Sequence, residues 1–489
     1  MLILKSVNFK KDRLETLIIP VCEDRQIHES KTVTALIAEA EKLREFTGKK
    51  NDEIMFYSSP EIKTGRILFL GLGKFKNLTT GSLRELSGRA VKKSIKIKLK
   101  NCHIAVPAAG KTGLQADLVL EAMLEGACLG NHIFDKYKYE KKETPLELIT
   151  LVVPPATAKK FNYLPLQVSA VCSGTIMARE WVSTPSNEKT PAQFARSIMA
   201  RAGTTGLKIS VLDEKKLKQK KFGALLAVAA GSKHRPRLLM LEHKPKNAKK
   251  TIALIGKGVT FDSGGINLKP AGALDGMKMD MAGAAAVAAT LITASKLNFN
   301  HHIIGVLPLV ENMPSGSAAR PGDVVRTYTG KTVEIGNTDA EGRLILADAM
   351  AYAIEAFKPH TVVDMATLTG ACVVALGEKI AGVFSPEDAL AVAIVESGKK
   401  TGERCWHLPL PDDYRELLKS DLADMSNMSS SRWGGAITAA LFLSEFAKDT
   451  NWAHIDIAGT AMIKKTDAFC TAGGTGFGVR LLLDWLKNL

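Results

Sequence analysis

The sequence predicts an α/β protein of two domains, with a small N-terminal α/β domain and a larger C-terminal one. The chain has 489 residues, more than a single hydrophobic core usually organises. Hydrophobic residues make up 46% of it and charged residues 24%, proportions typical of a globular protein. In the C-terminal part, apolar strand-like runs alternate with helical patterns. This alternation predicts a mostly parallel central sheet that is covered by helices.

Residues 1–165 are predicted to form the N-terminal domain. More than half of the formal net charge of +16 lies in this third of the chain. Residues 95–99 alternate Ile and Leu with Lys, which predicts a strand with one basic face. The other expected elements are strands over 17–21, 66–73 and 146–153, and helices over 32–46, 83–93 and 118–129.

A connecting helix is predicted over residues 166–186. A helical pattern runs over 167–182 and is broken by Ser-Thr-Pro-Ser-Asn at 183–187, residues that favour turns. We therefore place the domain boundary near 165–185 and assign residues 187–489 to the C-terminal domain.

The C-terminal domain is expected to bind its ligand at one edge of its sheet. In open α/β sheets, ligands bind outside the carboxyl ends of the strands. The expected strands are 208–212, 225–229, 237–242, 251–255, 302–310, 361–365 and 454–457, and the expected helices are 282–296, 343–357 and 435–446.

The cysteines and the N-terminus indicate a reduced, cytoplasmic protein. The seven cysteines are odd in number and form no Cys-x-x-Cys pair, a pattern that favours free thiols. The first residues are apolar for only four positions, and no uninterrupted apolar run reaches membrane-spanning length. The ten histidines form no His-Glu-x-x-His motif, so a metal would be held mainly by oxygen.

The most informative stretch is 337–344, Asn-Thr-Asp-Ala-Glu-Gly-Arg-Leu. If this segment is extended or loop-like, Asp339, Glu341 and Arg343 can share one face. Two buried carboxylates on one face require more positive charge than one arginine supplies, and a metal ion is the natural candidate. The alternative is a solvated acidic turn that ends in an ordinary ion pair.

Further charged residues lie where strands end or helices begin. Lys257 stands between two glycines after the strand predicted at 251–255, and Asp262 follows in a glycine-rich turn. Asp280 precedes the helix predicted at 282–296, where it could also be a simple N-cap. Together with Asp339 and Glu341 they suit two divalent ions about 3.5–4 Å apart. Oxygen ligands favour Mn²⁺, Mg²⁺ or Zn²⁺.

Five motifs together resemble the leucine (cytosol) aminopeptidases, a family of two-metal aminopeptidases. They span the C-terminal domain in the family's order, whereas the N-terminal third shows a weaker likeness, mainly at 134–138. The motifs lie at 256–265, 337–344, 364–371, 434–438 and 452–459.

The resemblance implies a role for each matching residue. Asp262 and Glu341 would bridge two Mn²⁺ or Zn²⁺ ions around a nucleophilic water. Lys269 would stabilise the oxyanion, and Arg343 would hold a bicarbonate that acts as general base. A ligating lysine must be neutral, and the adjacent dications would lower its pKa. The implied metal ligands are Lys257, Asp262, Asp280, Asp339 and Glu341.

The resemblance also implies the substrate and the assembly. The free α-amine of a peptide would bind a metal, so the enzyme would release unblocked N-terminal residues, leucine and other apolar residues preferred. Family members form hexamers, so we expect a homohexamer in which the N-terminal domain makes oligomer contacts. The first side chain would enter a pocket lined by Met277, Thr367, Gly370 and Ala458, although Met277 and Ala458 could equally be ordinary core.

Two other functions stay open. Lysines at 92–100, and lysines interleaved with tyrosines at 136–142, are compatible with nucleic-acid binding as an added role, although a solvated basic surface explains them as well. A two-metal phosphoesterase is the other alternative, against which the lysine-ligand and arginine pattern argues.

Overall fold

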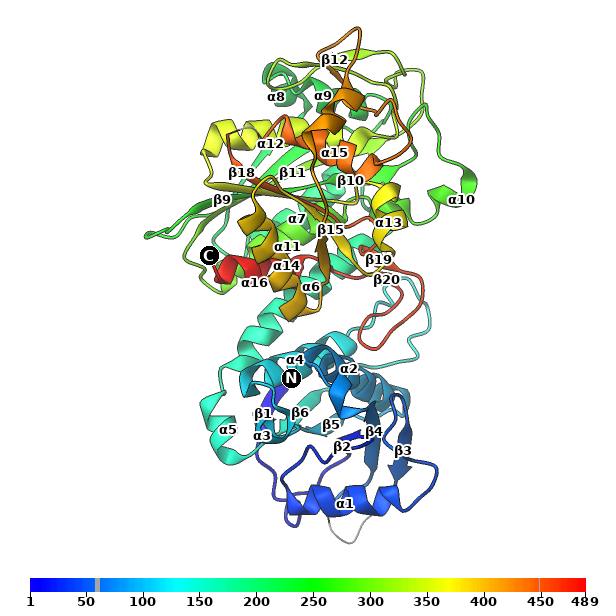
Figure 1. Ribbon diagram of the computed structural model, residues 1–489, viewed down its shortest axis with the longest axis vertical. Coiled ribbons are helices and arrows are strands. Elements are labelled where there is room, and N and C mark those ends of the chain that lie inside the picture. The colour runs from blue at the N-terminus through cyan, green and yellow to red at the C-terminus, as the bar shows by residue number, and fades with distance from the viewer. Residues whose placement is uncertain (58–61, 448) are drawn as a thin grey trace. The chain divides into compact units, whose positions relative to one another are not determined.

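The computed structural model describes residues 1–57, 62–447 and 449–489 (Figure 1). Its contacts divide the chain into two compact units. The first unit comprises Met1–Cys172 together with Lys465–Ala472, and the second comprises Ser173–Lys464 together with Gly473–Leu489. The division falls within helix α6, Leu164–Ser183. From the sequence we assigned residues 465–472 to the C-terminal domain. No local sequence pattern indicates that the chain returns to the first unit over these residues.

The first unit is built on a six-stranded sheet in the order β1-β6-β5-β2-β4-β3. Every neighbouring pair is parallel except β3 with β4. Helix α1 covers one face of the sheet, and α2 and α4 cover the other (Figure 1). The strands are β1 Leu2–Lys5, β2 Leu17–Cys22, β3 Glu53–Phe56, β4 Ile67–Gly73, β5 Asn101–Ala105 and β6 Leu148–Val152, and the helices are α1 Lys31–Glu41, α2 Thr80–Lys96, α3 Ala109–Thr112, α4 Ala116–Gly130 and α5 Pro155–Lys160.

The strand predicted at 95–99 is wrong. Helix α2 continues through Lys96, and Val91 and Ile95 are buried four residues apart on one face of it. Lys98 then takes a left-handed backbone conformation with φ of 57°, which no strand residue adopts. The strand of this region is β5, which begins at Asn101.

The second unit is built on a nine-stranded sheet. Its path runs β16-β15-β18-β14-β9-β11-β8-β7, and β10 pairs with β11 outside this path. The central strands β18, β14, β9 and β11 are parallel, and antiparallel pairs flank them on both sides. The strands are β7 Lys208–Leu212, β8 Arg237–His243, β9 Thr251–Gly256, β10 Gly258–Asp262, β11 His302–Asn312, β14 Thr361–Ala366, β15 Ala381–Phe384, β16 Cys405–His407 and β18 Asn451–Asp456.

Helices cover both faces of this sheet (Figure 1). Helix α12, with α9 and α15, lies on one face, and α11, with α7 and α16, lies on the other. Short strands β12 Val324–Arg326, β13 Thr332–Glu334 and β17 Met425–Ser426 form a separate small sheet, and β19 Met462–Ile463 pairs with β20 Gly473–Gly474. The helices are α7 Pro191–Ala202, α8 Glu214–Gln219, α9 Gly223–Ala229, α10 Ala271–Leu274, α11 Ala282–Lys296, α12 Glu341–Phe357, α13 Gly370–Leu376, α14 Asp388–Thr401, α15 Gly435–Ser444 and α16 Val479–Lys487.

The strand predicted at 225–229 is also wrong, because this stretch is helix α9. A short apolar run does not by itself distinguish a buried strand from a buried helix. Here Ala224, Leu225, Val228 and Ala229 are buried, which is the spacing of one helix face. The first turn is held by a side chain far along the chain, because the Leu225 amide donates to Asp348 Oδ2 at 2.9 Å.

Helix α11 lies unusually close to the sheet. A Cβ added to Gly283 would lie 2.0 Å from the carbonyl oxygen of Met365, and one added to Gly256 would lie 2.6 Å from Ala284 Cα. Glycine is therefore required on both sides of this contact. The contact orients the residue that follows Gly256, because the Lys257 amide donates to the Met365 carbonyl at 3.0 Å.

Two further sequence expectations concern thiols and membranes. All seven cysteines are free thiols. One stretch, Ala271–Lys296, is long and apolar enough to span a membrane by length and composition, but 83% of its apolar window is buried inside the protein. A helix in the core of a folded domain is buried in this way.

Candidate metal centre

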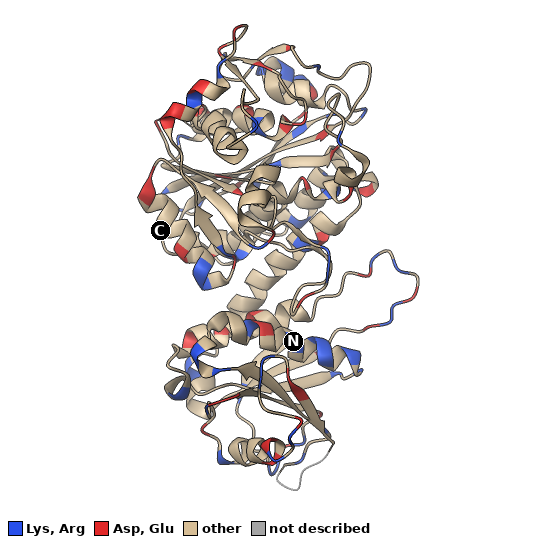
Figure 2. Ribbon diagram, turned by 45° about the vertical axis from the view of Figure 1, so that its right-hand side comes forward, with Lys and Arg blue, Asp and Glu red and all other residues tan. Residues whose placement is uncertain are grey.

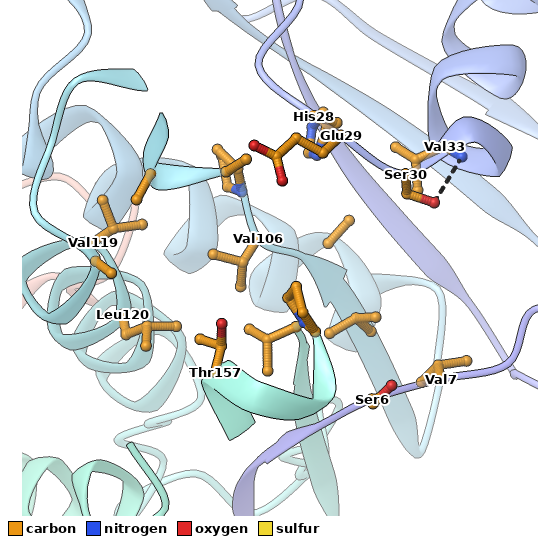
Figure 3. Close-up of a pocket in the computed structure, with 18 of the residues that line it drawn as sticks. Ser6, Val7, His28, Glu29, Ser30, Val33, Val106, Val119, Leu120 and Thr157 are labelled. Atoms are coloured by element: carbon orange, nitrogen blue, oxygen red, sulfur yellow. Dashed lines mark hydrogen bonds between the residues drawn. The ribbon is translucent and has the colours of Figure 1, made fainter. Parts of the chain in front are cut away.

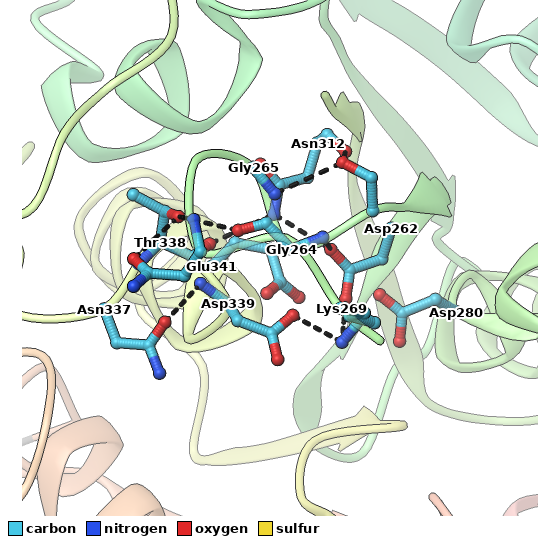
Figure 4. A network of polar contacts seen from close by, with 12 residues as sticks. Asp262, Gly264, Gly265, Lys269, Asp280, Asn312, Asn337, Thr338, Asp339 and Glu341 are labelled. Carbon is cyan, nitrogen blue, oxygen red and sulfur yellow. Dashed lines mark hydrogen bonds and ion pairs between the residues drawn. The ribbon is translucent and has the colours of Figure 1, made fainter. Parts of the chain in front are cut away.

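Four carboxylates and Lys269 gather at the carboxyl edge of the central strands (Figure 4), and Lys257 pairs with two of these carboxylates. Lys257 lies between β9 and β10, and Asp262 is the last residue of β10. Asp280 comes just before α11, and Glu341 is the first residue of α12. The parallel strands end at the same edge of the sheet, so segments far apart in sequence deliver their side chains to one place.

Lys257 is fully enclosed among carboxylates. Its Nζ lies 2.8 Å from Asp280 Oδ1 and 2.9 Å from Glu341 Oε1, and it donates to the Thr367 carbonyl at 2.8 Å. Burial opposes its charge, but the charges of Asp280 and Glu341 outweigh burial and raise the pKa of Lys257 above its ordinary value. A dication among the same carboxylates acts in the opposite direction, as a neutral lysine ligand requires.

Lys269 joins the other two carboxylates. Its Nζ lies 2.8 Å from Asp262 Oδ2 and also contacts Asp339 Oδ1. Burial is again outweighed by the neighbouring charges, Asp262 first, so the pKa of Lys269 is raised. The side chain is 15% exposed, so it lies at the rim of the cluster, whereas Lys257 lies inside it.

Asp262 is held in one orientation by its neighbours. Its Oδ1 accepts from the Gly264 amide at 3.0 Å and from Asn312 Nδ2 at 2.9 Å, which leaves Oδ2 toward Lys269. The same Asn312 amide donates to the Thr338 carbonyl at 3.0 Å and so links β10 to the loop that carries Asp339.

Of the two forms considered for the segment before α12, extended or loop-like, the structure has the loop-like one, which is a turn. The Asp339 amide donates to Asn337 Oδ1 at 2.8 Å, and Glu341 already belongs to the helix. Alternation along a strand therefore does not align Asp339, Glu341 and Arg343. Asp339 and Glu341 reach the cluster because the helix begins there, and Arg343 points instead to Asn427, to whose carbonyl it donates at 2.8 Å.

Arg343 keeps its charge at neutral pH. Burial lowers its pKa to about 10, and the charges of Glu341 and Asp456 oppose the shift. Asn427 fixes the segment around it, because its Oδ1 accepts from the Gly336 amide at 2.8 Å and its Nδ2 donates to the Asn337 carbonyl at 2.8 Å.

The carboxylates have the arrangement that a metal ion needs. Ligand oxygens of Asp262, Asp280 and Glu341, all buried, lie within 4.8 Å of one another. Asp280 Oδ2 and Glu341 Oε2 are buried without a hydrogen-bond partner among the described residues. Burial raises the pKa of both carboxyl groups, which shows how costly their charges are without further cations. The residues present thus fit a divalent cation held by oxygen. Asp280 is not the N-cap of α11, since that position is Met281.

The expected substrate pocket residues lie on three segments near this cluster. Thr367 Oγ1 donates to Asp280 Oδ1 at 2.8 Å, so it contacts the carboxylates directly. Gly370 starts α13, and a Cβ at this position would meet nothing within 4 Å, so it faces open space. Met277 lies in the short 3-10 helix before Asp280, and the Ala458 amide donates to Asp456 Oδ1 at 3.0 Å.

Asp456 organises this side of the site and was not predicted. Its Oδ1 accepts from the amides of Leu368 and Ala458, and its Oδ2 accepts from the amide and the hydroxyl of Thr369. One buried carboxylate thereby joins the loop after β14 to the loop after β18. Asn312, Asn427 and Asp456 were all missed. Asn312 and Asp456 do end strands of the central sheet, a signal that could have identified them.

Comparison with known proteins gives a consistent result. The family described as "Cytosol aminopeptidase family, catalytic domain" matches residues 176–483, and its N-terminal domain matches residues 18–141. A "Probable cytosol aminopeptidase" of Syntrophotalea carbinolica is 42% identical over 91% of this chain and 90% of the relative. Another, of Chlorobium phaeobacteroides, is 39% identical over 98% of both chains. The solved structure "Bottromycin maturation enzyme BotP in complex with Mn" superposes with a TM-score of 0.87 and 35% identity, covering 97% of this chain and 99% of the other.

Proposed function

The chain belongs to the cytosol aminopeptidase family and is a metal-dependent aminopeptidase, and on that premise we propose that it releases unblocked apolar residues, leucine foremost, from the N-termini of peptides. The observation that carries the proposal is the buried carboxylate cluster with its two unpartnered oxygens, Asp280 Oδ2 and Glu341 Oε2. Buried carboxylates beyond the number that nearby lysines neutralise are the expected ligands of dications.

We assign the metal ligands as Lys257, Asp262, Asp280, Asp339 and Glu341, for two ions of Mn²⁺ or Zn²⁺. The ions would polarise the scissile carbonyl and activate the attacking water, and bicarbonate on Arg343 would supply the general base. The "in complex with Mn" of the similar solved structure supports manganese as the first metal to test.

Lys269 and Arg343 are the charged side chains assigned to the reaction itself. Lys269 stays protonated because Asp262 and Asp339 hold its charge, so it can donate to the oxygen on which negative charge develops. Arg343 keeps its charge and is positioned by the Asn427 carbonyl, which leaves its other N–H groups to bind an anion.

The apolar preference rests on the segments around Met277, Thr367, Gly370 and Ala458. Open space at Gly370 leaves room for a side chain of the substrate. Asp456 holds the loops of Thr367 and Ala458, so the wall of the pocket is a rigid one. A compact apolar pocket selects among side chains by about 1–3 kcal/mol per methylene, so the preference should be graded and not absolute.

We further propose a cytoplasmic homohexamer. The word "cytosol" in the names of the relatives supports the location. Large apolar side chains on the second unit are left exposed, among them Val374, Trp406, Leu422 and Trp433, each at least 62% exposed. Side chains of this size mark a subunit interface where they form one contiguous apolar patch.

The test is hydrolysis of a panel of aminoacyl amides together with the metal content of the protein. We expect leucyl amide to be cleaved, a chelator to abolish the activity, and Mn²⁺ or Zn²⁺ to restore it. Asp339→Asn and Glu341→Gln should each lose metal and activity, whereas Asp323→Asn, at a carboxylate paired with Arg320 outside the cluster, should keep both. Full activity of Glu341→Gln after metal removal and re-addition would refute the ligand assignment.

An added nucleic-acid-binding role is the second candidate. Of the two basic segments, 92–100 is partly engaged within the first unit, since Lys92 donates to the carbonyls of Asp467 and Cys470 and Lys93 pairs with Glu53. The segment 136–142 has no regular structure, and Tyr137 and Tyr139 are exposed there. Lysine and arginine are interspersed with acidic residues over both units (Figure 2), which favours a local contact over a broad basic face.

Salt dependence distinguishes this role from a solvated surface. If Lys136, Lys138, Lys141 and Lys142 contact phosphates, neutralising all four should lower the slope of log K against log salt by roughly 3–4. Neutralising Lys215, Lys216, Lys220 and Lys221, four exposed lysines of the second unit, should leave the slope unchanged. Equal slopes for both variants would remove the 136–142 segment from consideration.

A further inference from the structure

The first unit contains a cavity that the aminopeptidase reaction does not use. Its volume is about 430 Å³, within the range of roughly 300–1,000 Å³ that small-molecule sites occupy. All of the described residues that line it belong to the first unit, and the carboxylate cluster lies entirely in the second unit. The cavity is therefore distinct from the catalytic centre.

The cavity lies where this type of sheet binds ligands. Residues that follow β2, β5 and β6 line it, so it opens at the carboxyl ends of three parallel strands. From β2 the chain continues to β3 and β4 on one side, and from the adjacent β5 it continues to β6 on the other. Neighbouring strands whose connections leave in opposite directions form a crevice between them, and open α/β sheets bind ligands there.

The walls of the cavity are more apolar than polar, with Ser6, Ser30 and Thr157 among the side chains that line it. Its apolar lining residues include Phe9. Val106 lies between Val7 on one side and Val119 and Leu120 of α4 on the other (Figure 3). No lysine or arginine occurs among its described lining residues, so it lacks the cations that hold a phosphate or carboxylate group. His28 supplies no charge either, because burial lowers its pKa to about 4, and its Nε2 donates to the Pro20 carbonyl at 2.7 Å.

One charged group faces this apolar space. Glu29 is exposed at the opening, and its carboxylate is directed over Val106 (Figure 3). Among the described residues, no lysine or arginine forms an ion pair with it. A carboxylate at the mouth of an apolar cavity attracts a cation and repels an anion.

We propose that this crevice binds a small molecule with an apolar body and one cationic amino group, the body among Val106, Val119 and Leu120 and the ammonium on the Glu29 carboxylate. The apolar part of the wall supplies most of the binding free energy, and the single carboxylate fixes the orientation and the charge that is selected. The proposal stands independently of the peptidase activity, because no residue of the metal cluster takes part.

The test uses the full chain with valine and leucine methyl groups labelled for NMR, and 2-phenylethylamine as the probe. Amines can also bind at the catalytic metals, so the readout is restricted to the methyl signals of Val106, Val119 and Leu120. We expect the probe to shift these signals. Two molecules of similar shape, the neutral 2-phenylethanol and the anionic 3-phenylpropionate, should bind at least tenfold more weakly.

Two variants and one control complete the test. Glu29→Gln should weaken the amine at least tenfold and remove its advantage over the alcohol. Gly110→Leu should fill the mouth of the cavity with a large side chain. The backbone need not move to accept it, because a Cβ at position 110 would contact only Glu29 Oε1, at 3.6 Å. Glu39→Gln removes the same charge from an exposed position of α1 outside the cavity and should bind like the wild type. Leucyl amide hydrolysis should be unchanged in all three.

The proposal is overturned if millimolar amine leaves the methyl signals in place. It is also overturned if 3-phenylpropionate binds as well as the amine, or if Glu29→Gln and Glu39→Gln have equal affinity. None of these outcomes bears on the peptidase activity, which is measured separately on leucyl amide.

Discussion

Gly342 is packed directly against the side chain of Lys257. A Cβ at position 342 would lie 2.6 Å from Lys257 Cε and 2.8 Å from its Nζ. Contacts of this length do not occur, so the lysine can reach Asp280 and Glu341 only because residue 342 has no side chain. The glycine after Glu341 is thus part of the site, although it carries no functional group.

Gly342→Ala should therefore inactivate the enzyme. Displacement of Lys257 by about 1 Å is enough to cost roughly 100-fold in turnover. Alanine is a better helix former than glycine by about 1 kcal/mol, so weakening of α12 cannot explain the loss. The measurement is kcat on leucyl amide with metal content. Gly272→Ala, where a Cβ would meet nothing within 4 Å, is the matched control. Equal activity of the two variants would contradict the packing argument.

Lys269→Met should lower turnover and leave the metal bound. The ammonium is assigned to the developing oxyanion, and loss of one such donor typically costs roughly 100- to 1,000-fold in kcat. Because Lys269 also pairs with Asp262 and Asp339, its removal frees two carboxylates and should not weaken metal affinity. Metal content and kcat are measured on the same preparation. Loss of metal together with activity would reassign Lys269 to the metal site.

Asp456→Asn should raise KM more than it lowers kcat. The amide replaces one of two oxygens that each accept two hydrogen bonds, so at least one backbone N–H of Leu368, Thr369 or Ala458 is left facing a donor. The loops that bear Thr367 and Ala458 should then loosen, while the carboxylate cluster stays in place. Thr369→Val removes one of the four hydrogen bonds to Asp456 and also the N-cap hydrogen bond from the Cys372 amide, and it should raise KM in the same direction. A fall in kcat alone, with KM unchanged, would show that Asp456 does not position the pocket.

The sequence places the charged residues of the candidate site correctly wherever their position depends on where a strand or helix ends. Buried apolar runs locate β9 and α11, so Lys257, Asp262 and Asp280 could be placed at one edge of the sheet before the structure was known. Prediction from the sequence fails where contacts between residues far apart in the chain determine the local structure. Helix α9 depends in part on Asp348, more than a hundred residues away, and the chain order does not show that Asn427 orients Arg343. The role of Gly342 cannot be predicted from the sequence either, because it depends on the space that this residue leaves for the Lys257 side chain.

Asp348 gives a prediction about stability and pH. It is fully buried in α12, and its two oxygens accept from the amides of Leu225, at 2.9 Å, and Tyr328, at 2.7 Å. Burial raises its pKa to about 7, and the two amides oppose the shift. The folded-state pKa thus lies above the ordinary value, so its stabilising contribution is complete below about pH 4 and is lost as pH rises through 7.

Asp348→Asn should therefore remove part of the fall in stability between pH 4 and pH 7. That part is at most about 4 kcal/mol, from a shift of roughly three pKa units. The variant should be less stable overall by about 1–3 kcal/mol, because its amide group faces one backbone N–H from which the carboxylate accepted a hydrogen bond.

All five tryptophans lie between residue 181 and residue 485 within the second unit, so fluorescence during urea unfolding reports on that unit alone. A chelator is present throughout, because metal binding is itself pH-dependent. All other ionisable groups are the same in both proteins, so the difference between the two curves isolates Asp348. Parallel curves would show that its carboxyl group does not ionise in this range.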